Sequence, residues 1–262
     1  MDGNSNKTRS ISAFILLGFP SSRPLQILLF FIFFLIYLLT VMENLLIVIL
    51  IWTNSKLHKP MYFFLGHLSF LETWYVTVTV PKLLCIFAVE SREISLSSCM
   101  LQLYFFIALA CTECVLLTVM AFDRYVAICK PLHYVTIMNW NLCILLALGS
   151  WFIGFLISLI KVYYISRVTF CHSNVINHFY CDISPILNLA CTDMKLAELV
   201  DFVLALLILL VPLLLTFVSY SCILRTVLSI PNLQWKTKGL FDLHISFGCS
   251  SYILFSHPLH VC

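Results

Sequence analysis

The stretch MAFDRYVAICKPLHY at residues 120–134 contains the side chains whose chemistry is easiest to interpret, an aspartate next to an arginine. It directly follows an apolar run, so Asp123 and Arg124 lie where a buried helix would reach water. This position predicts an ion pair at a membrane boundary, with an arginine able to contact a neighbouring helix or a protein that docks from the cytosol. The alternative is that both charges only extend toward water and mark the membrane edge.

The sequence shows no arrangement of residues that would catalyse a reaction. It contains no His-Glu-x-x-His, no Gly-x-Ser-x-Gly and no paired-aspartate motif. We therefore expect no enzymatic activity, and we predict neither a cofactor nor a catalytic metal.

Four of the twelve cysteines could form disulfides: Cys99, Cys171, Cys181 and Cys191. Cys99 begins an apolar run, and the other three cysteines lie in the long connection between two later apolar runs. With the N-terminus outside, all four lie on the oxidising side of a membrane, where disulfides persist. Four cysteines allow three pairings, and their spacing does not choose among them. The alternative to a disulfide is a reduced thiol at a helix end, and this is our interpretation of the other eight cysteines.

Composition indicates that lipid surrounds the elements that position these residues. Of 262 residues, 61% are hydrophobic and 10% charged, and the mean hydropathy is +1.02. Soluble domains have roughly 45–50% apolar and about 25% charged residues. A soluble fold of this length could not bury so much apolar surface. The net charge of +3 is too small to indicate a nucleic-acid partner.

Five segments are long enough to cross a bilayer as helices, which takes about 20 apolar residues. Backbone polar groups in lipid must be satisfied within the segment, so the sequence predicts an all-α membrane protein. The expected spans are 25–52, 60–83, 99–122, 141–160 and 199–228, between a tail at 1–24 and a tail at 231–262. A sixth candidate at 239–262 is interrupted by polar residues and Pro258, and we do not expect a stable span there.

Orientation does not follow from the basic residues, which are similarly frequent on both sides of the predicted spans. Asn6-Lys7-Thr8 is a glycosylation sequon, which is used only if the N-terminal tail is lumenal. The cysteine positions favour the same orientation. We therefore predict an extracellular tail with a glycan on Asn6.

Three acidic residues, Glu43, Glu72 and Glu113, lie inside predicted spans. A charge at the centre of a span costs about 2.5–3.5 kcal/mol on insertion scales, and such residues usually face the bundle interior. We expect an interior polar network, which a cation could join, rather than contacts with a ligand.

Several short motifs follow one another in order along the chain. Together with residues 120–134 they are Leu16-Leu17-Gly18-Phe19, PMYFFLGHLSFLE at 60–72, HFYCD at 178–182, LACTD at 189–193 and Ser219-Tyr220. From about Asn6 to Pro231 the chain resembles the olfactory receptor family of rhodopsin-like G-protein-coupled receptors. The resemblance implies a seven-transmembrane receptor fold, of which this chain shows five clear spans and a doubtful sixth, in the plasma membrane.

The resemblance also implies roles for matching residues. Cys99 would pair with Cys181, and Cys171 with Cys191. The switch that engages a stimulatory olfactory-type G protein would consist of three consecutive residues, Asp123, Arg124 and Tyr125.

A small hydrophobic odorant would bind between the outer halves of the third and fifth spans and the loop between them. An apolar pocket suits a volatile ligand with few polar atoms. Residues at helical spacing that would line this pocket are Tyr104, Ala108, Cys111, Thr112, Leu204, Leu207 and Ile208. Each of them could equally be ordinary helix packing.

The resemblance fails after Ile230-Pro231, where the family continues through Lys-Ala-Phe-Ser-Thr-Cys into a sixth span. This chain reads NLQWKTKGLFDLHISFGCSSYILFSHPLHVC instead. Permissible codons from Trp235 onward, read one nucleotide later, give GKQKAFSTCISHLVVVLIFYSHIPFMYV, which is similar to the family's sixth span. Our hypothesis is a frameshift near residues 232–235, which sequencing of the encoding DNA would test.

A chain without the last two helices is expected to be defective in signalling and retained in the endoplasmic reticulum. One alternative is a non-signalling remnant that associates with intact receptors. Another is a channel or transporter subunit, although no internal repeat of the kind common in transporters is visible.

Overall fold

The computed structural model describes residues 13–16, 22–89, 93–168, 175–176, 180–187, 189 and 195–229. Five of its helices are long and apolar enough to cross a membrane: α1 (Arg23–Thr53), α2 (Pro60–Val89), α3 (Leu96–Cys129), α5 (Trp140–Ser166) and α7 (Lys195–Leu228). The prediction of an all-α membrane protein with five clear spans is confirmed. Asn6, Cys171, Cys191 and the predicted tail at 231–262, with its doubtful sixth span, lie outside the described residues.

The helices extend beyond the predicted spans because an apolar run marks only the part of a helix at the depth of the hydrocarbon core. α3 continues to Cys129, past the predicted end at residue 122. Its start is fixed by Ser95, whose hydroxyl accepts a hydrogen bond from the Ser98 N–H at 3.1 Å. Asn139 caps α5 in the same way, through the Leu142 N–H at 2.9 Å.

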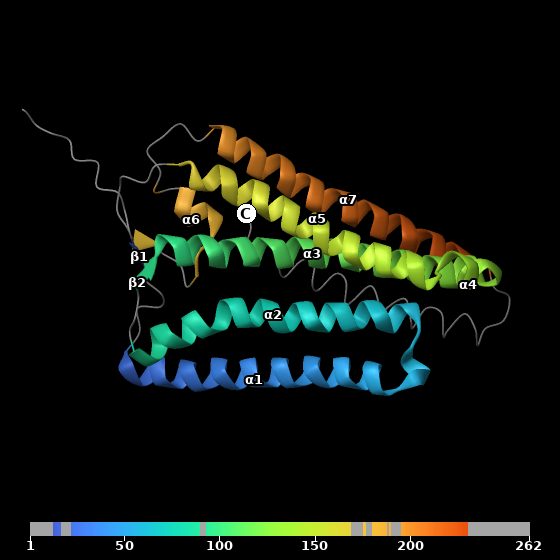
Figure 1. The fold of residues 1–262 in the computed structure, drawn as a ribbon, viewed down its shortest axis with the longest axis horizontal. Coiled ribbons are helices and arrows are strands. Elements are labelled where there is room, and N and C mark those ends of the chain that lie inside the picture. Colours follow the sequence, from blue (N-terminus) through green and yellow to red (C-terminus); the bar gives the residue numbers. More distant parts are fainter. Residues whose placement is uncertain are drawn as a thin grey trace, which may run out of the picture.

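The long helices lie alongside one another, with α3 at the centre (Figure 1). α3 contacts α2, α5 and α7, whereas α1 packs mainly on α2. In the most apolar window of α3, 61% of the residues are buried, against 6% in α1. α3 is therefore the helix whose side chains meet the most neighbouring elements.

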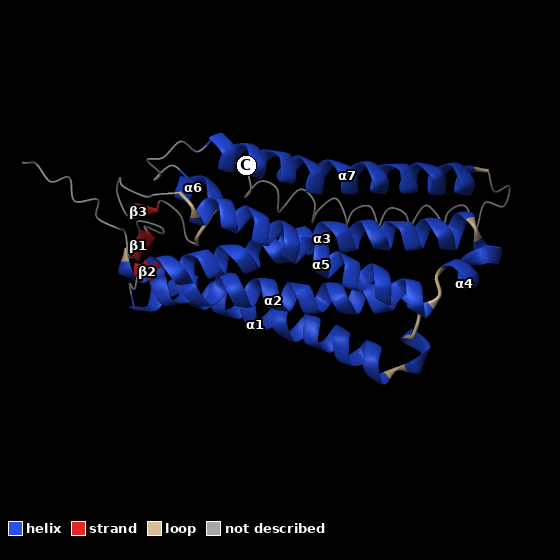
Figure 2. Cartoon of the chain, turned by 45° about the horizontal axis from the view of Figure 1, so that its top comes forward, coloured by secondary structure: helices blue, strands red, loops and turns tan. Residues whose placement is uncertain are grey.

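Short elements distinguish the two ends of the bundle (Figure 2). The end that we call outer has a small sheet of β1 (Ala13–Leu16), β2 (Glu93–Ser95) and β3 (Val175–Ile176), in the order β2-β1-β3. β1 pairs antiparallel with β2 and parallel with β3. The opposite, inner end has α4 (Tyr134–Ile137) and the 3-10 turns η1 (Ser55–Leu57) and η2 (Pro131–His133). α6 (Ile183–Leu187) lies near the outer end.

Candidate functional site

The connection between α5 and α7 is fastened onto the outer end of α3. A disulfide joins Cys181 of this connection to Cys99 in the first turn of α3. The Gln102 amide donates a hydrogen bond to the Val78 carbonyl at 3.0 Å and accepts one from the Cys181 N–H at 3.3 Å. Side chains of α6, including Ile183, are buried in the hydrophobic cluster at this end. We call this the outer cluster; it combines the sheet, α3, α5, α6 and the start of α7.

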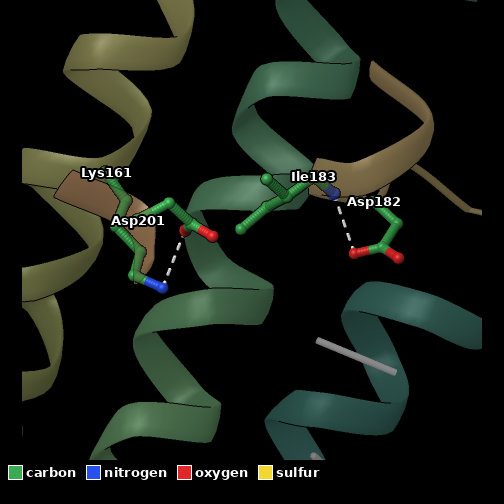
Figure 3. A network of polar contacts seen from close by, with 4 residues as sticks. All are labelled: Lys161, Asp182, Ile183 and Asp201. Atoms are coloured by element: carbon green, nitrogen blue, oxygen red, sulfur yellow. Dashed lines mark hydrogen bonds and ion pairs between the residues drawn. The ribbon is translucent and has the colours of Figure 1, made fainter. Parts of the chain in front are cut away.

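A buried ion pair lies beside the outer cluster and links α5 to α7 (Figure 3). The Lys161 Nζ is 2.8 Å from the Asp201 Oδ1, and the Lys161 side chain is only 2% exposed. Desolvating a charge is expensive unless a partner compensates it, so each residue requires the other. Figure 3 also shows Asp182, whose carboxylate accepts a hydrogen bond from the Ile183 N–H at 2.8 Å. The pair places one donor and one acceptor beside the outer cluster.

Three of the predicted odorant residues contact α5. A Cβ added at Gly154 of α5 would lie 2.7 Å from the Ala108 carbonyl oxygen and would also clash with the Thr112 hydroxyl. The Ser158 hydroxyl donates to the Tyr104 carbonyl at 2.6 Å. Tyr104, Ala108 and Thr112 therefore lie along a close contact between α3 and α5.

The other four predicted odorant residues differ in how exposed their side chains are. Cys111 is buried in the outer cluster, and Ile208 packs against that cluster from α7. Leu204 is half-buried. Leu207 is 53% exposed on α7 among the described residues. Cys111 and Ile208 thus both belong to or contact the outer cluster, and the role of the seven residues in odorant binding stays a prediction.

At the inner end, Asp123 is held by the segment that follows α3. The Tyr134 hydroxyl donates a hydrogen bond to the Asp123 Oδ1 at 2.9 Å, and Asp123 is 2% exposed. Burial and the bond to Asp123 raise the pKa of Tyr134 above its ordinary value, so the hydroxyl remains a donor. Among the described side chains no ion pair joins Asp123 to Arg124, which corrects the ion pair expected from their adjacency.

Arg124 and Tyr125 are half-buried beside this bond. The Tyr125 ring packs against the α3–α7 contact at the inner end, which includes Ala121 and Tyr220. Cys129 and Thr226 approach to 3.2 Å between their side chains across the same helices. Of the three residues Asp123, Arg124 and Tyr125, it is therefore Tyr125 that contacts the place where α3 and α7 meet, whereas Asp123 is bonded to Tyr134 of α4.

The acidic residues inside the spans differ in burial. Glu113 is 2% exposed on α3 and Glu72 is half-buried on α2. Glu43 is exposed on α1, so within the described part of the chain it does not join an interior network as expected. Among the described residues, no group of three or more histidine, cysteine, aspartate or glutamate side chains could hold a metal ion.

Sequence reasoning missed Gln102, Tyr134 and the pairing of Lys161 with Asp201. A signal was available for the ion pair, because charges within membrane helices usually pair with one another. Asp201 lies inside a predicted span and Lys161 is the first residue after another. Which helices become neighbours was not deducible from spacing alone.

Comparison with known proteins gives one consistent result. The sequence model of a family described as "Olfactory receptor" matches residues 33–256. Human olfactory receptor 6B1 is 62% identical over 240 residues, which cover 92% of this chain and 77% of that protein. Human olfactory receptor 6P1 is 56% identical over 87% of this chain and 72% of its own length. Rat olfactory receptor 226 is 52% identical over 97% of this chain and 80% of its own length.

Proposed function

The chain belongs to the olfactory receptor family, and from this premise we propose that it binds an odorant at its outer end and couples to a stimulatory olfactory-type G protein at its inner end. The ligand is a small, mainly apolar molecule with one polar group. The chain is a multi-pass membrane protein, and we propose the plasma membrane as its site of action.

The buried pair of Lys161 and Asp201 is the observation that supports this ligand class. It lies next to the outer cluster, which includes Cys111 and Ile183. Ligand sites for small molecules are mostly apolar with a few well-placed polar groups. An ammonium and a carboxylate side by side can donate to and accept from one hydroxyl or carbonyl of a ligand, while the cluster contacts its apolar part.

The proposed orientation places the disulfide outside and Arg124 inside. Disulfides persist on the oxidising side of a membrane, and Cys99–Cys181 is at the outer end. Asp123, Arg124 and Tyr125 then lie at the cytosolic end of the bundle, where a G protein docks. Epitope or protease mapping tests this orientation, and an extracellular position of residue 124 would contradict it.

Ligand-dependent stabilisation of the purified chain tests odorant binding without requiring a signal. A ligand at 100 times its Kd stabilises a protein by about 2.7 kcal/mol, which is measurable as a rise in Tm. We expect a panel of volatile alcohols, ketones and esters to include compounds that raise the Tm of the wild type. Asp201→Asn should weaken this rise.

Glu198→Gln is the matched control, because Glu198 is an exposed carboxylate one turn earlier on α7. It removes the same charge from the same helix without affecting the ion pair. An equal loss of ligand response in both variants, or no response to any compound in the wild type, would contradict the proposed site.

Signalling is a separate question, because residues 230–262, where we expect the chain to depart from the family's sixth span, lie outside the described residues. The expectations of a signalling defect and of retention in the endoplasmic reticulum stay predictions. An odorant-dependent cyclic AMP response from this sequence at the cell surface would refute them and leave the binding proposal intact.

A further inference from the structure

A concave surface lies at the inner end of the bundle, opposite the proposed odorant site. It is a groove of about 840 Å³ between α1, η1, α2 and α5. Small-molecule sites in proteins typically measure about 300–1,000 Å³, so the groove has the volume of a ligand site. We call it the aromatic groove, after Phe63, Phe70, Trp140 and Trp151 in its lining.

Ring contacts join the aromatic side chains of the groove into a continuous wall. The Phe63 ring lies 5.7 Å from that of Trp140 and 4.7 Å from that of His67. The Trp151 Nε1–H donates to the His67 Nδ1 at 3.3 Å, and the Trp151 ring lies 5.9 Å from Phe70. This wall connects the first turns of α2 and α5 with positions deeper in the membrane. It is long and apolar, which suits a hydrocarbon chain.

The groove lies on the perimeter of the bundle at the level where helices leave the membrane. Trp52 at the end of α1 is 83% exposed, and Leu148 of α5 is 61% exposed. Both line the groove. Tryptophan is enriched at the membrane–water boundary. The molecules that meet this surface are therefore lipids, and in the proposed orientation they belong to the cytoplasmic leaflet.

The mouth of the groove has basic residues and, in the part of the chain that the structure describes, no acidic ones. Lys59 and His58 line it and are exposed, and none of the lining residues that the structure describes is an aspartate or glutamate. The cytoplasmic leaflet contains anionic lipids, which attract a nearby lysine by about 1 kcal/mol. A sterol, with one hydroxyl group, has no charge to match these residues.

We propose that the aromatic groove binds one anionic glycerophospholipid, with its headgroup at Lys59 and one acyl chain along the aromatic wall. The proposal uses the orientation given above but not the odorant site, so the two can fail independently. A second copy of this chain fits the groove less well, because it would have to supply both an acidic group and an apolar wedge.

Photo-crosslinking of lipid to the full chain in nanodiscs tests the proposal. Phosphatidylserine and phosphatidylcholine probes with the same diazirine acyl chain are compared in a phosphatidylcholine bilayer. We expect phosphatidylserine to label peptides of the groove about five-fold more, the ratio that corresponds to about 1 kcal/mol for one lysine. Lys59→Gln should reduce this ratio to near one.

Two matched controls separate the groove from general surface effects. Lys56 is an exposed lysine of η1 that does not line the groove, so Lys56→Gln should keep the preference. Gly66 lines the groove, and a Cβ there would be 3.7 Å from the Ile51 Cδ1, an ordinary contact. Gly66→Leu should fill the groove and reduce labelling by both probes, whereas Gly149→Leu, in open space on α5, should not.

Four results would overturn the proposal. They are equal labelling by both probes in the wild type, equal effects of Lys56→Gln and Lys59→Gln, displacement of the phospholipid probe by a sterol, and crosslinking of two protein copies through the groove. The Cys99–Cys181 disulfide, checked by peptide mass, reports that each variant is folded. If Gly66→Leu does not fold, the comparison of Lys56→Gln with Lys59→Gln is sufficient to test the proposal.

Discussion

The Tyr134 hydroxyl donates a 2.9 Å hydrogen bond to Asp123 and so connects the last residue of the MAFDRYVAICKPLHY stretch to its fourth. The segment between them leaves α3, makes the turn η2 and returns the Tyr134 ring to the end of the helix. Asp123 thus has a partner outside its own helix, and the neighbouring Arg124 is not its ion-pair partner among the described residues. The bond therefore holds the segment after η2 against the end of α3.

Removal of this bond should destabilise the inner end. Tyr134→Phe leaves the buried Asp123 carboxylate without its donor, and hydrogen bonds to charged groups contribute about 1.5–3 kcal/mol. We expect a loss of this size in the free energy of unfolding, measured by SDS titration of the chain in mixed micelles. Tyr62→Phe, which also removes a hydroxyl at the inner end, should change the free energy of unfolding by less than about 0.5 kcal/mol. Equal losses would show that the bond is unimportant.

The same bond predicts a pH dependence. Burial raises the pKa of Tyr134 in the folded state, so the folded chain retains this proton more strongly than the unfolded chain does. Stability from this group is therefore complete below about pH 10, the ordinary pKa of tyrosine, and declines as pH rises further. The difference in unfolding free energy between wild type and Tyr134→Phe should be constant from pH 6 to about pH 9. A difference that disappears within that range would contradict this assignment.

A double-mutant cycle should detect the coupling between Lys161 and Asp201. Lys161→Met leaves a partly buried carboxylate alone, and breaking a buried pair in this way costs about 3–5 kcal/mol. Adding Asp201→Leu should recover most of the loss, because an apolar pair of similar volume suits the outer cluster. The measurement is again unfolding in mixed micelles. Additive losses in the double variant would show that the two side chains do not interact.

The five spans could be predicted from the sequence because lipid imposes a single requirement, a long apolar helix with its backbone satisfied. The rotation of each helix about its own axis could not be predicted from the sequence. Helical spacing places Tyr104, Ala108 and Thr112 on one face of α3, but it does not say which neighbour that face meets. Gly154 on α5 decides this, since only a residue without a side chain permits such close contact.

The same limit applies to the polar contacts. Lys161 and Asp201 are far apart in sequence, and their pairing depends on α5 and α7 lying side by side. The pairing of Cys99 with Cys181 followed from family resemblance, because spacing left three pairings open. The hydrogen bonds of Gln102 to Val78 and Cys181 depend on α2 and the loop approaching together, for which no local pattern exists.

Loss of the disulfide should loosen the outer end. Cys99 and Cys181 are separated by 82 positions. In the entropic model, closing a loop of this length lowers the conformational entropy of the unfolded chain and so stabilises the folded chain by about 4.5 kcal/mol. We expect Cys99→Ser to lower the free energy of unfolding by up to about this amount. Cys85→Ser, at an exposed free thiol near the same end, is the control and should have little effect. Equal stability of both variants would mean that the bond does not fasten the loop.

Gly154 allows α3 and α5 to touch, so adding one methyl group there should separate them. The new Cβ would meet the Ala108 carbonyl oxygen at 2.7 Å and clash with the Thr112 hydroxyl, which itself bonds that carbonyl. Backbone at such a distance cannot move aside cheaply, and overpacking of this kind typically costs about 1–3 kcal/mol. Gly149→Ala makes the same change on the same helix in open space, and it should be neutral or slightly stabilising since alanine favours helices. Thermal unfolding of the two variants checks this, and a Gly154→Ala chain as stable as Gly149→Ala would show that the two helices are not in close contact at this position.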